Sequence, residues 1–228
     1  MTIIEAIKAR HSVRAYKNQA LTNDAIRALE NSIAAANRDG QLHIQLVLNE
    51  PKAFAGPMSR YGKFRNVSNY LVMAGQRAND LDERIGYHGE HLVLLAQTLG
   101  LNSCWVGLNY TKVPSAYTLA AGEKIVCLIA IGYGQTSGLG HKTKSVERVS
   151  NASATTPPWF RMGVEAALLA PTAVNQQKFS FEYIGIKNGC HRVLAKRGRS
   201  IIGYTRIDLG IARYHFEIGA GKENFEWA

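Results

Sequence analysis

The chain has 228 residues, of which 46% are hydrophobic, and its formal net charge is +10. A chain of this length and composition can bury a substantial core in one large domain or two small ones, which excludes a disordered protein. An excess of Lys and Arg is typical of nucleic-acid-binding proteins, but here these residues are spread along the whole chain without a recognisable nucleic-acid module. No stretch is long enough to span a bilayer. We therefore expect neither a nucleic-acid partner nor a membrane partner.

The N-terminus and the cysteines indicate a reducing compartment. The first eight residues include Glu5 and lack a long apolar core, unlike a secretory signal. Cys104, Cys127 and Cys190 are isolated and have no metal-ligand spacing, so reduced thiols in a cytoplasm fit best. His88 and His91 could share a helical face, but no third ligand lies near them. We expect a cytoplasmic protein without a metal site.

Helical and strand patterns alternate over the first 150 residues. Ile26, Leu29 and Ile33 recur at helical spacing after Thr22, a suitable N-cap residue. Residues 42–48 alternate between apolar and polar, with Val47 as the exception, which predicts a strand. A short apolar run follows at 70–74. The pattern then predicts a buried helix at 92–99, ending before Gly100, and a strand buried on both faces at 125–131.

Beyond a linker-like stretch at 150–158, the pattern starts again. A helix around Val164 to Leu169 contains Glu165, which matches Glu30 at a separation of 135 residues. The segment 211–219 matches the helix at 92–99, and its Gly219 lies 119 residues after Gly100. Because the two separations differ, a repeat requires a deletion in the second copy. The hypothesis is an internal repeat, with a first half at 1–150 and a shorter second half at 151–228.

A basic cluster follows the first apolar residues of the chain. Arg10, His11, Ser12 and Arg14 place three cationic or potentially cationic groups and a hydroxyl within five positions. Guanidinium groups bind phosphate in a bidentate manner, and a hydroxyl adds a short donor, so the cluster suits a phosphate site. The alternative is a solvated basic helix end, where cations are favourable next to the helix dipole.

Two further motifs join this cluster. Residues 170–177 read Ala-Pro-Thr-Ala-Val-Asn-Gln-Gln, and residues 100–107 read Gly-Leu-Asn-Ser-Cys-Trp-Val-Gly. Together with the basic cluster, these motifs resemble the FMN-dependent nitroreductase family over most of the chain. The resemblance implies an α+β fold, a nitroreductase-like sandwich of a mixed central sheet flanked by helices. Each motif also has an ordinary structural interpretation, as a helix-to-strand turn or a strand end.

The resemblance also implies which residues would bind FMN. Arg10 and Arg14 would hold its phosphate, and His11 and Ser12 would reach the phosphate, the ribityl chain or the ring edge. The isoalloxazine ring would lie against a loop and a strand end, and two late lysines would complete the phosphate pocket. These predicted residues are Trp105, Val106, Gly107, Lys142, Lys144, Pro171, Thr172, Asn175 and Gln177. Solvated lysines remain the alternative for Lys142 and Lys144.

The departures from the family pattern suggest a fused pseudo-dimer. Nitroreductases of this family are homodimers with flavin at the subunit interface. Here the segment 34–41, which we expect to be the first-half loop, has lost its proline, and the second half has no Arg-x-Ser-x-Arg stretch. Because each half lacks what the other retains, two intertwined half-repeats would form one complete flavin site per chain. Such a chain would be a monomer, or at most a weak homodimer.

The function that the resemblance implies is that of an oxidoreductase. It would take hydride from NADH or NADPH onto FMN and pass electrons to a nitroaromatic, a quinone or a similar planar acceptor by a ping-pong mechanism. No amino-acid side chain is required as a catalytic acid, base or nucleophile, because the flavin carries the chemistry. The alternative is a flavin-binding protein without general nitroreductase activity.

Overall fold

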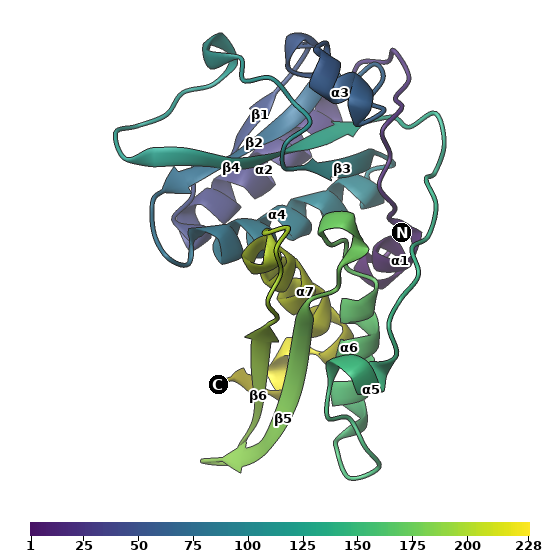
Figure 1. The fold of residues 1–228 in the computed structure, drawn as a ribbon, viewed down its shortest axis with the longest axis vertical. Helices are drawn as coiled ribbons and strands as arrows, with labels where there is room; N and C mark the ends of the chain where they lie inside the picture. Colours follow the sequence, from purple (N-terminus) through teal and green to yellow (C-terminus); the bar gives the residue numbers. More distant parts are fainter.

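The computed structural model describes residues 1–228, arranged as two sheets connected by helices (Figure 1). The first sheet has the order β1-β2-β4-β3, with every neighbouring pair antiparallel. Its strands are β1 (Gln45–Val47), β2 (Asn69–Gln76), β3 (Asn102–Val106) and β4 (Glu123–Gly132). The second sheet contains β5 (Phe179–Lys187) and β6 (Cys190–Arg197), which are antiparallel, and β7 (Glu226–Trp227), which is parallel to β6.

Seven helices lie around and between the sheets. They are α1 (Ile3–Ala9), α2 (Asn23–Gly40), α3 (Pro57–Tyr61), α4 (Leu81–Thr98), α5 (Val146–Val149), α6 (Pro158–Leu168) and α7 (Thr205–Ala220). Short 3-10 turns occur at Lys52–Phe54, Pro114–Ala116, Ala173–Asn175 and Lys222–Asn224. Figure 1 shows α4 and α7 crossing between the first sheet and the second. The α+β class is confirmed.

The first sheet is buried on both faces. Leu71 and Met73 of β2 pack with α2 and α4, whereas Tyr70 and Val72 pack against Phe54 and other residues of a second apolar cluster. This arrangement explains why Val47 departs from the alternating pattern, since its side chain is buried in that second cluster. A strand with two covered faces needs no polar face.

The first-half segment at 34–41 is not a loop. Residues 34–40 belong to α2, which ends only at Gln41 in the left-handed conformation. Asn37 lies inside this helix and bonds the backbone of Ile44 through its side chain. In the second half, α6 ends at Leu168 and Pro171 follows shortly after. Without a proline at the corresponding place, α2 continues for further turns.

Helices α4 and α7 cross at two glycines with a local pseudo-two-fold relation. A Cβ added to Gly86 would overlap the carbonyl oxygen of Ile207, and one added to Gly210 would overlap that of Glu83. His91 contacts the Tyr214 hydroxyl at 2.7 Å, and His215 contacts Glu90 at 2.9 Å. Both pairs of contacts are consistent with matching α4 to α7 at a separation of 124 residues.

Two tryptophans lie against corresponding positions of the two helices. Trp105 lies against Gly89, and Trp227 lies under the guanidinium of Arg213, 4.6 Å from the ring centroid. Positions 89 and 213 are again 124 residues apart. The repeat of α4 in α7 stays a prediction, but the match of Gly219 to the helix-terminating Gly100 is wrong. Gly219 lies inside α7, and Gly221, with φ of 76°, follows its last residue.

The division into halves at 1–150 and 151–228 remains a prediction. The largest apolar cluster contains Leu92 and Ile129 from the first part of the chain and Phe160 and Phe216 from the second. A core shared in this way holds α4 and α7 in fixed positions, and the candidate site lies beside their crossing.

Candidate functional site

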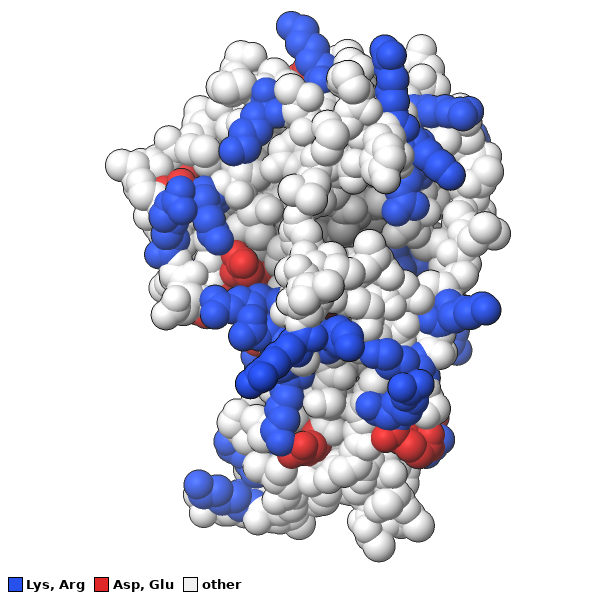
Figure 2. Space-filling model, in the orientation of Figure 1, with Lys and Arg blue, Asp and Glu red and all other residues white.

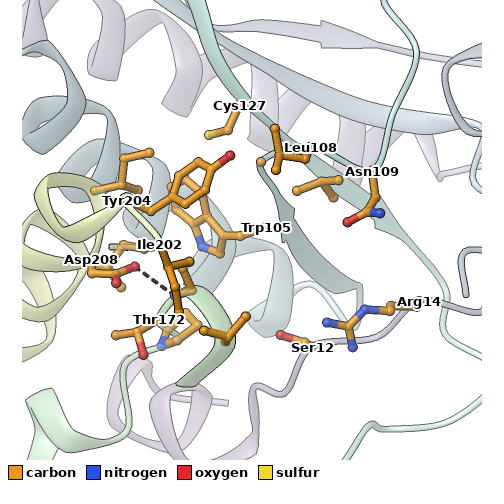
Figure 3. A pocket seen from close by; sticks show the side chains of 17 residues that line it. Ser12, Arg14, Trp105, Leu108, Asn109, Cys127, Thr172, Ile202, Tyr204 and Asp208 are labelled. Atoms are coloured by element: carbon orange, nitrogen blue, oxygen red, sulfur yellow. Dashed lines mark hydrogen bonds between the residues drawn. The ribbon is translucent and has the colours of Figure 1, made fainter. Parts of the chain in front are cut away.

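A pocket with a volume of about 280 Å³ lies between the end of β3 and the N-terminal part of α7 (Figure 3). Four segments far apart in the sequence, with Cys127 of β4, form its walls. They contribute Ser12 and Arg14; Trp105, Val106, Gly107, Leu108 and Asn109; Pro171, Thr172, Ala173 and Val174; and Ile202, Tyr204, Ile207, Asp208 and Ile211. Residues from before and after position 150 therefore face the same cavity.

Ser12 and Arg14 reach the pocket because the chain becomes extended after α1. The helix ends at Ala9, and the following backbone pairs with β3, where the Val13 amide donates to the Ser103 carbonyl at 3.0 Å. Side chains of extended backbone alternate, so Ser12 and Arg14 share one side while Val13 is buried on the other. The basic stretch is thus an edge of the sheet and not a solvated helix end.

Arg10 lies beneath the pocket and does not line it. The residue is buried, and its Nε lies 3.8 Å from Oε1 of Glu90, which is also fully buried. Glu90 in turn accepts a hydrogen bond from Nε1 of Trp105 at 2.9 Å. This network fixes the Trp105 ring in the pocket wall, so Arg10 contributes to the site through Glu90 and Trp105.

His11 also lies outside the pocket lining. It is partly buried beneath the segment at Gly138 and Gly140, whose backbone passes close to its side chain. Burial, followed by the nearby charge of Arg10, lowers the pKa of His11. A neutral imidazole is a poor counter-ion for phosphate.

The end of β3 matches the predicted ring-binding segment, since Trp105, Val106 and Gly107 all line the cavity. A Cβ added at Gly107 would lie 2.6 Å from the phenol ring of Tyr204. Only glycine lets another group approach the backbone this closely.

The loop at 171–177 divides into two parts. Pro171 and Thr172 face the pocket. Asn175 and Gln177 do not line it, because both side-chain amides donate to the carbonyl of Lys142, at 2.9 and 2.8 Å. The Thr172 hydroxyl accepts a hydrogen bond from the backbone amide of Gln177 at 3.1 Å, and this bond holds the loop in a tight turn.

Lys142 and Lys144 hold this loop from outside the pocket. The ammonium group of Lys144 donates to the carbonyls of Gln176 and Gln177, at 2.9 and 2.5 Å, and its backbone amide donates to the Gln177 side chain. Burial lowers the pKa of Lys144. The structure therefore brings the two lysines to the predicted loop, while their side chains do not line the cavity.

Sequence reasoning missed the wall that α7 and the preceding turn contribute. Its most polar member is Asp208, which is 2% exposed. Oδ1 of Asp208 accepts from the Ala173 amide at 3.0 Å, and Oδ2 accepts from the side chain of Gln176 at 2.6 Å. Burial raises the pKa of this carboxyl to about 6. The available signal was Asp208 itself, an acidic residue between the apolar Ile207 and Leu209 of α7.

The surroundings of the pocket are basic. In Figure 2 a hollow opens near the centre of the view, and Lys and Arg side chains outnumber Asp and Glu on this face. Such a field attracts anions toward the opening.

No group of three or more His, Cys, Asp or Glu side chains is placed to hold a metal ion. None of the helices combines the length and apolar character needed to cross a bilayer.

Comparison with known proteins places the chain in a family. Residues 2–220 match the family described as "Putative TM nitroreductase". A solved structure from Thermotoga maritima, described as a putative nitroreductase, is similar over 98% of this chain and 85% of its own, with a TM-score of 0.68 and 23% identity. One from Desulfovibrio desulfuricans, described as a putative nitroreductase in complex with FMN, covers 69% of this chain and 99% of its own at 19% identity and a TM-score of 0.53.

The chain thus has the fold of the nitroreductases and a pocket at the place where three family motifs meet. It belongs to the nitroreductase family whose description matches nearly its whole length. No curated protein matches it.

Proposed function

We propose that the protein is an FMN-dependent oxidoreductase that uses NADH or NADPH to reduce nitroaromatics, quinones or similar planar acceptors. The observation that carries the proposal is the pocket, which joins a cationic edge at Arg14 to an apolar wall around the β3 end. The similar structure from Desulfovibrio desulfuricans holds FMN, and one from Clostridium acetobutylicum, at 16% identity and a TM-score of 0.50, is described as a putative NADH oxidase.

The residues present suit the two ends of FMN. Arg14 can bind the phosphate in a bidentate manner, and the Ser12 hydroxyl can add a hydrogen bond. The ring would lie along Trp105, Val106 and Gly107, with Pro171 and Thr172 on the opposite side. His11, Lys142, Lys144, Asn175 and Gln177 would support these contacts by holding the segments that line the pocket, as Arg10 would through Glu90.

FMN, when bound, supplies hydride and electron transfer, and the chain supplies binding and orientation. The open face of a flavin ring bound in the pocket would accept one planar molecule at a time. A reductant and an acceptor would then have to occupy the same place in turn, which is the basis for proposing ping-pong turnover.

A second cavity supports one flavin site per chain. It has a volume of about 660 Å³ and is lined in part by Asp80, Glu83, Arg84 and Tyr87 of α4 and its N-cap. These positions precede Tyr204, Ile207, Asp208 and Ile211 of the first pocket by 124 residues each. Glu83 and Tyr87 therefore stand where the first pocket has Ile207 and Ile211, and the second cavity lacks this apolar wall. We propose that the halves form a pseudo-dimer, which light scattering should find as a monomer.

Binding of FMN should stabilise the folded chain, because a ligand that contacts both halves binds only the native state. At free FMN about a hundredfold above its dissociation constant, the gain should be about 2.7 kcal/mol. Thermal unfolding with and without FMN measures it, and riboflavin, which lacks the phosphate, is the matched control. An unchanged midpoint at saturating FMN would exclude a flavin site. If the midpoint rises, anaerobic mixing with NADH or NADPH tests whether the bound flavin is reducible.

Arg14→Ala should weaken FMN binding by about 2 kcal/mol, or about 30-fold, since the variant loses a charge-assisted contact to phosphate. Arg14→Lys should recover only part of the loss, because an ammonium group lacks the planar fork. Lys17→Ala, an exposed cation three residues further on, is the control for general charge. Fluorescence titration with FMN measures all three, and equal losses for Arg14→Ala and Lys17→Ala would remove Arg14 from the site.

A further inference from the structure

The ring of Tyr204 occupies the part of the pocket that lies directly over Gly107. Two carbons of this ring and its hydroxyl oxygen lie 2.6 to 2.7 Å from where a Gly107 Cβ would stand. Figure 3 shows the ring projecting into the cavity from the turn before α7, above Trp105. The remaining volume of about 280 Å³ lies just below the range of about 300–1,000 Å³ for pockets that hold organic ligands. A flavin ring and the Tyr204 ring would compete for this space.

The backbone that carries Tyr204 is strained. Tyr204 has a φ of 61° and follows Gly203 with a φ of 81°. A positive φ is unusual for a bulky residue and costs on the order of 1–3 kcal/mol, so surrounding contacts must hold it. Movement of the turn would relieve this strain.

A small set of contacts holds the turn in place. The side-chain amide of Gln176 donates both to the Gly203 carbonyl, at 3.0 Å, and to Oδ2 of Asp208. Oε1 of Gln176 is buried without a partner. The preceding residues Ile201 and Ile202 lie in irregular backbone, Ile201 fully and Ile202 about half exposed. From outside the segment 200–208, the backbone of the turn is held by the Gln176 side chain at Gly203. The Tyr204 carbonyl accepts from the Asp208 amide at 2.9 Å, and the Tyr204 ring packs against the main apolar cluster.

We propose that Tyr204 is a movable cover of the ring subsite, which leaves Gly107 when a planar cofactor enters and so determines how readily that subsite is occupied. This inference rests on the proposed function, because the entering group is the isoalloxazine ring. The apparent affinity for FMN is the intrinsic affinity multiplied by the fraction of molecules in the open form. Opening breaks the Gln176 contact to Gly203, and the strained backbone at Tyr204 offsets part of that loss.

The test is FMN binding by variants of the whole chain, followed by equilibrium titration and stopped-flow fluorescence. Tyr204→Ala removes the ring and should bind FMN at least fivefold more tightly, with faster association. Gln176→Ala releases the turn and should also speed association. Tyr204→Phe, which retains the ring, should not reproduce the gain of Tyr204→Ala, and Ile201→Ala, on the exposed side of the turn, should stay within twofold of the parent.

The possible failures can be told apart. If the parent binds FMN and Tyr204→Ala binds it equally or more weakly, Tyr204 is a fixed wall of the pocket and the inference is overturned. If neither the parent nor any variant binds FMN, the proposed function itself fails. Circular dichroism of each variant shows whether it is folded, and Gln176→Ala provides the same test should Tyr204→Ala not fold.

Discussion

Gly210→Ala should destabilise the chain by more than about 4 kcal/mol, a loss that point mutations reach only through severe steric or core defects. The new methyl group would overlap the carbonyl oxygen of Glu83 and lie 2.8 Å from the Tyr87 amide. Both atoms belong to the backbone of α4, which cannot turn away as a flexible side chain can. Helix propensity alone predicts the opposite, because Ala is favoured over Gly by about 1 kcal/mol.

The overlap would also move the pocket wall. Separating α7 from α4 displaces Ile207, Asp208 and Ile211, which line the cavity. Urea denaturation measures the loss, and Gly86→Ala should reproduce it from the other helix. Gly140→Ala is the control, since the nearest atom to its added methyl group lies 3.6 Å away. A loss below 1 kcal/mol for Gly210→Ala would mean that the helices do not cross at these glycines.

The sequence pattern predicts best those helices and strands whose side chains are all buried to a similar degree along the element. The apolar run at 125–131 predicts a strand buried on both faces, and β4 spans Glu123–Gly132. By contrast, the helical pattern begins only at Leu92, whereas α4 begins at Leu81. Its first half contacts α7 through Gly86 and pairs Glu83 with Arg213, so small and charged residues replace the expected apolar stripe.

The candidate site could be predicted in part, because the motifs mark the segments but not the direction of each side chain. Arg10 and Arg14 carry the same charge, yet Arg10 is buried beside Glu90 while Arg14 lines the pocket. Helix α1 ends at Ala9, and the backbone is extended from Arg10 onward. This change from helical to extended backbone places the side chains of the two arginines in different surroundings. Tyr204 and Asp208 escaped prediction because they meet the β3 end only through the crossing of α4 and α7.

Asp208 lies in the pocket wall with its carboxyl group buried, and burial of the charged carboxylate lowers the stability of the folded chain. Two hydrogen bonds, from the Ala173 amide and the Gln176 side chain, favour its charged form, but burial outweighs them and raises its pKa from 3.8 to about 6. The folded chain therefore holds this proton more tightly than the unfolded chain does. Stability falls as pH rises from about 4 to about 6, and above pH 6 the full cost is present.

Asp208→Asn should therefore stabilise the chain at pH 8 by at most about 3 kcal/mol, since a pKa unit corresponds to about 1.4 kcal/mol, and by much less at pH 4. The gain falls short of this limit because the amide nitrogen of Asn cannot accept the hydrogen bond that Gln176 donates to Oδ2 of Asp208. The amide of Asn cannot ionise, and its oxygen can still accept from the Ala173 amide. Urea denaturation of parent and variant between pH 4 and pH 8 measures the difference. Asp24→Asn, on the exposed face of α2, controls for the change in net charge.

A gain that is the same at pH 4 and pH 8, or a loss at pH 8, would show that Asp208 is not a buried carboxylate held against its preferred state. The expected gain in stability indicates a functional role for Asp208, because a residue that lowers stability at neutral pH does not serve the fold. Asp208 joins Ala173 in the loop to Gln176, which holds the turn of Tyr204. The stabilised variant should accordingly have an altered rate of FMN association, since an Asn side chain replaces the carboxylate that Gln176 contacts.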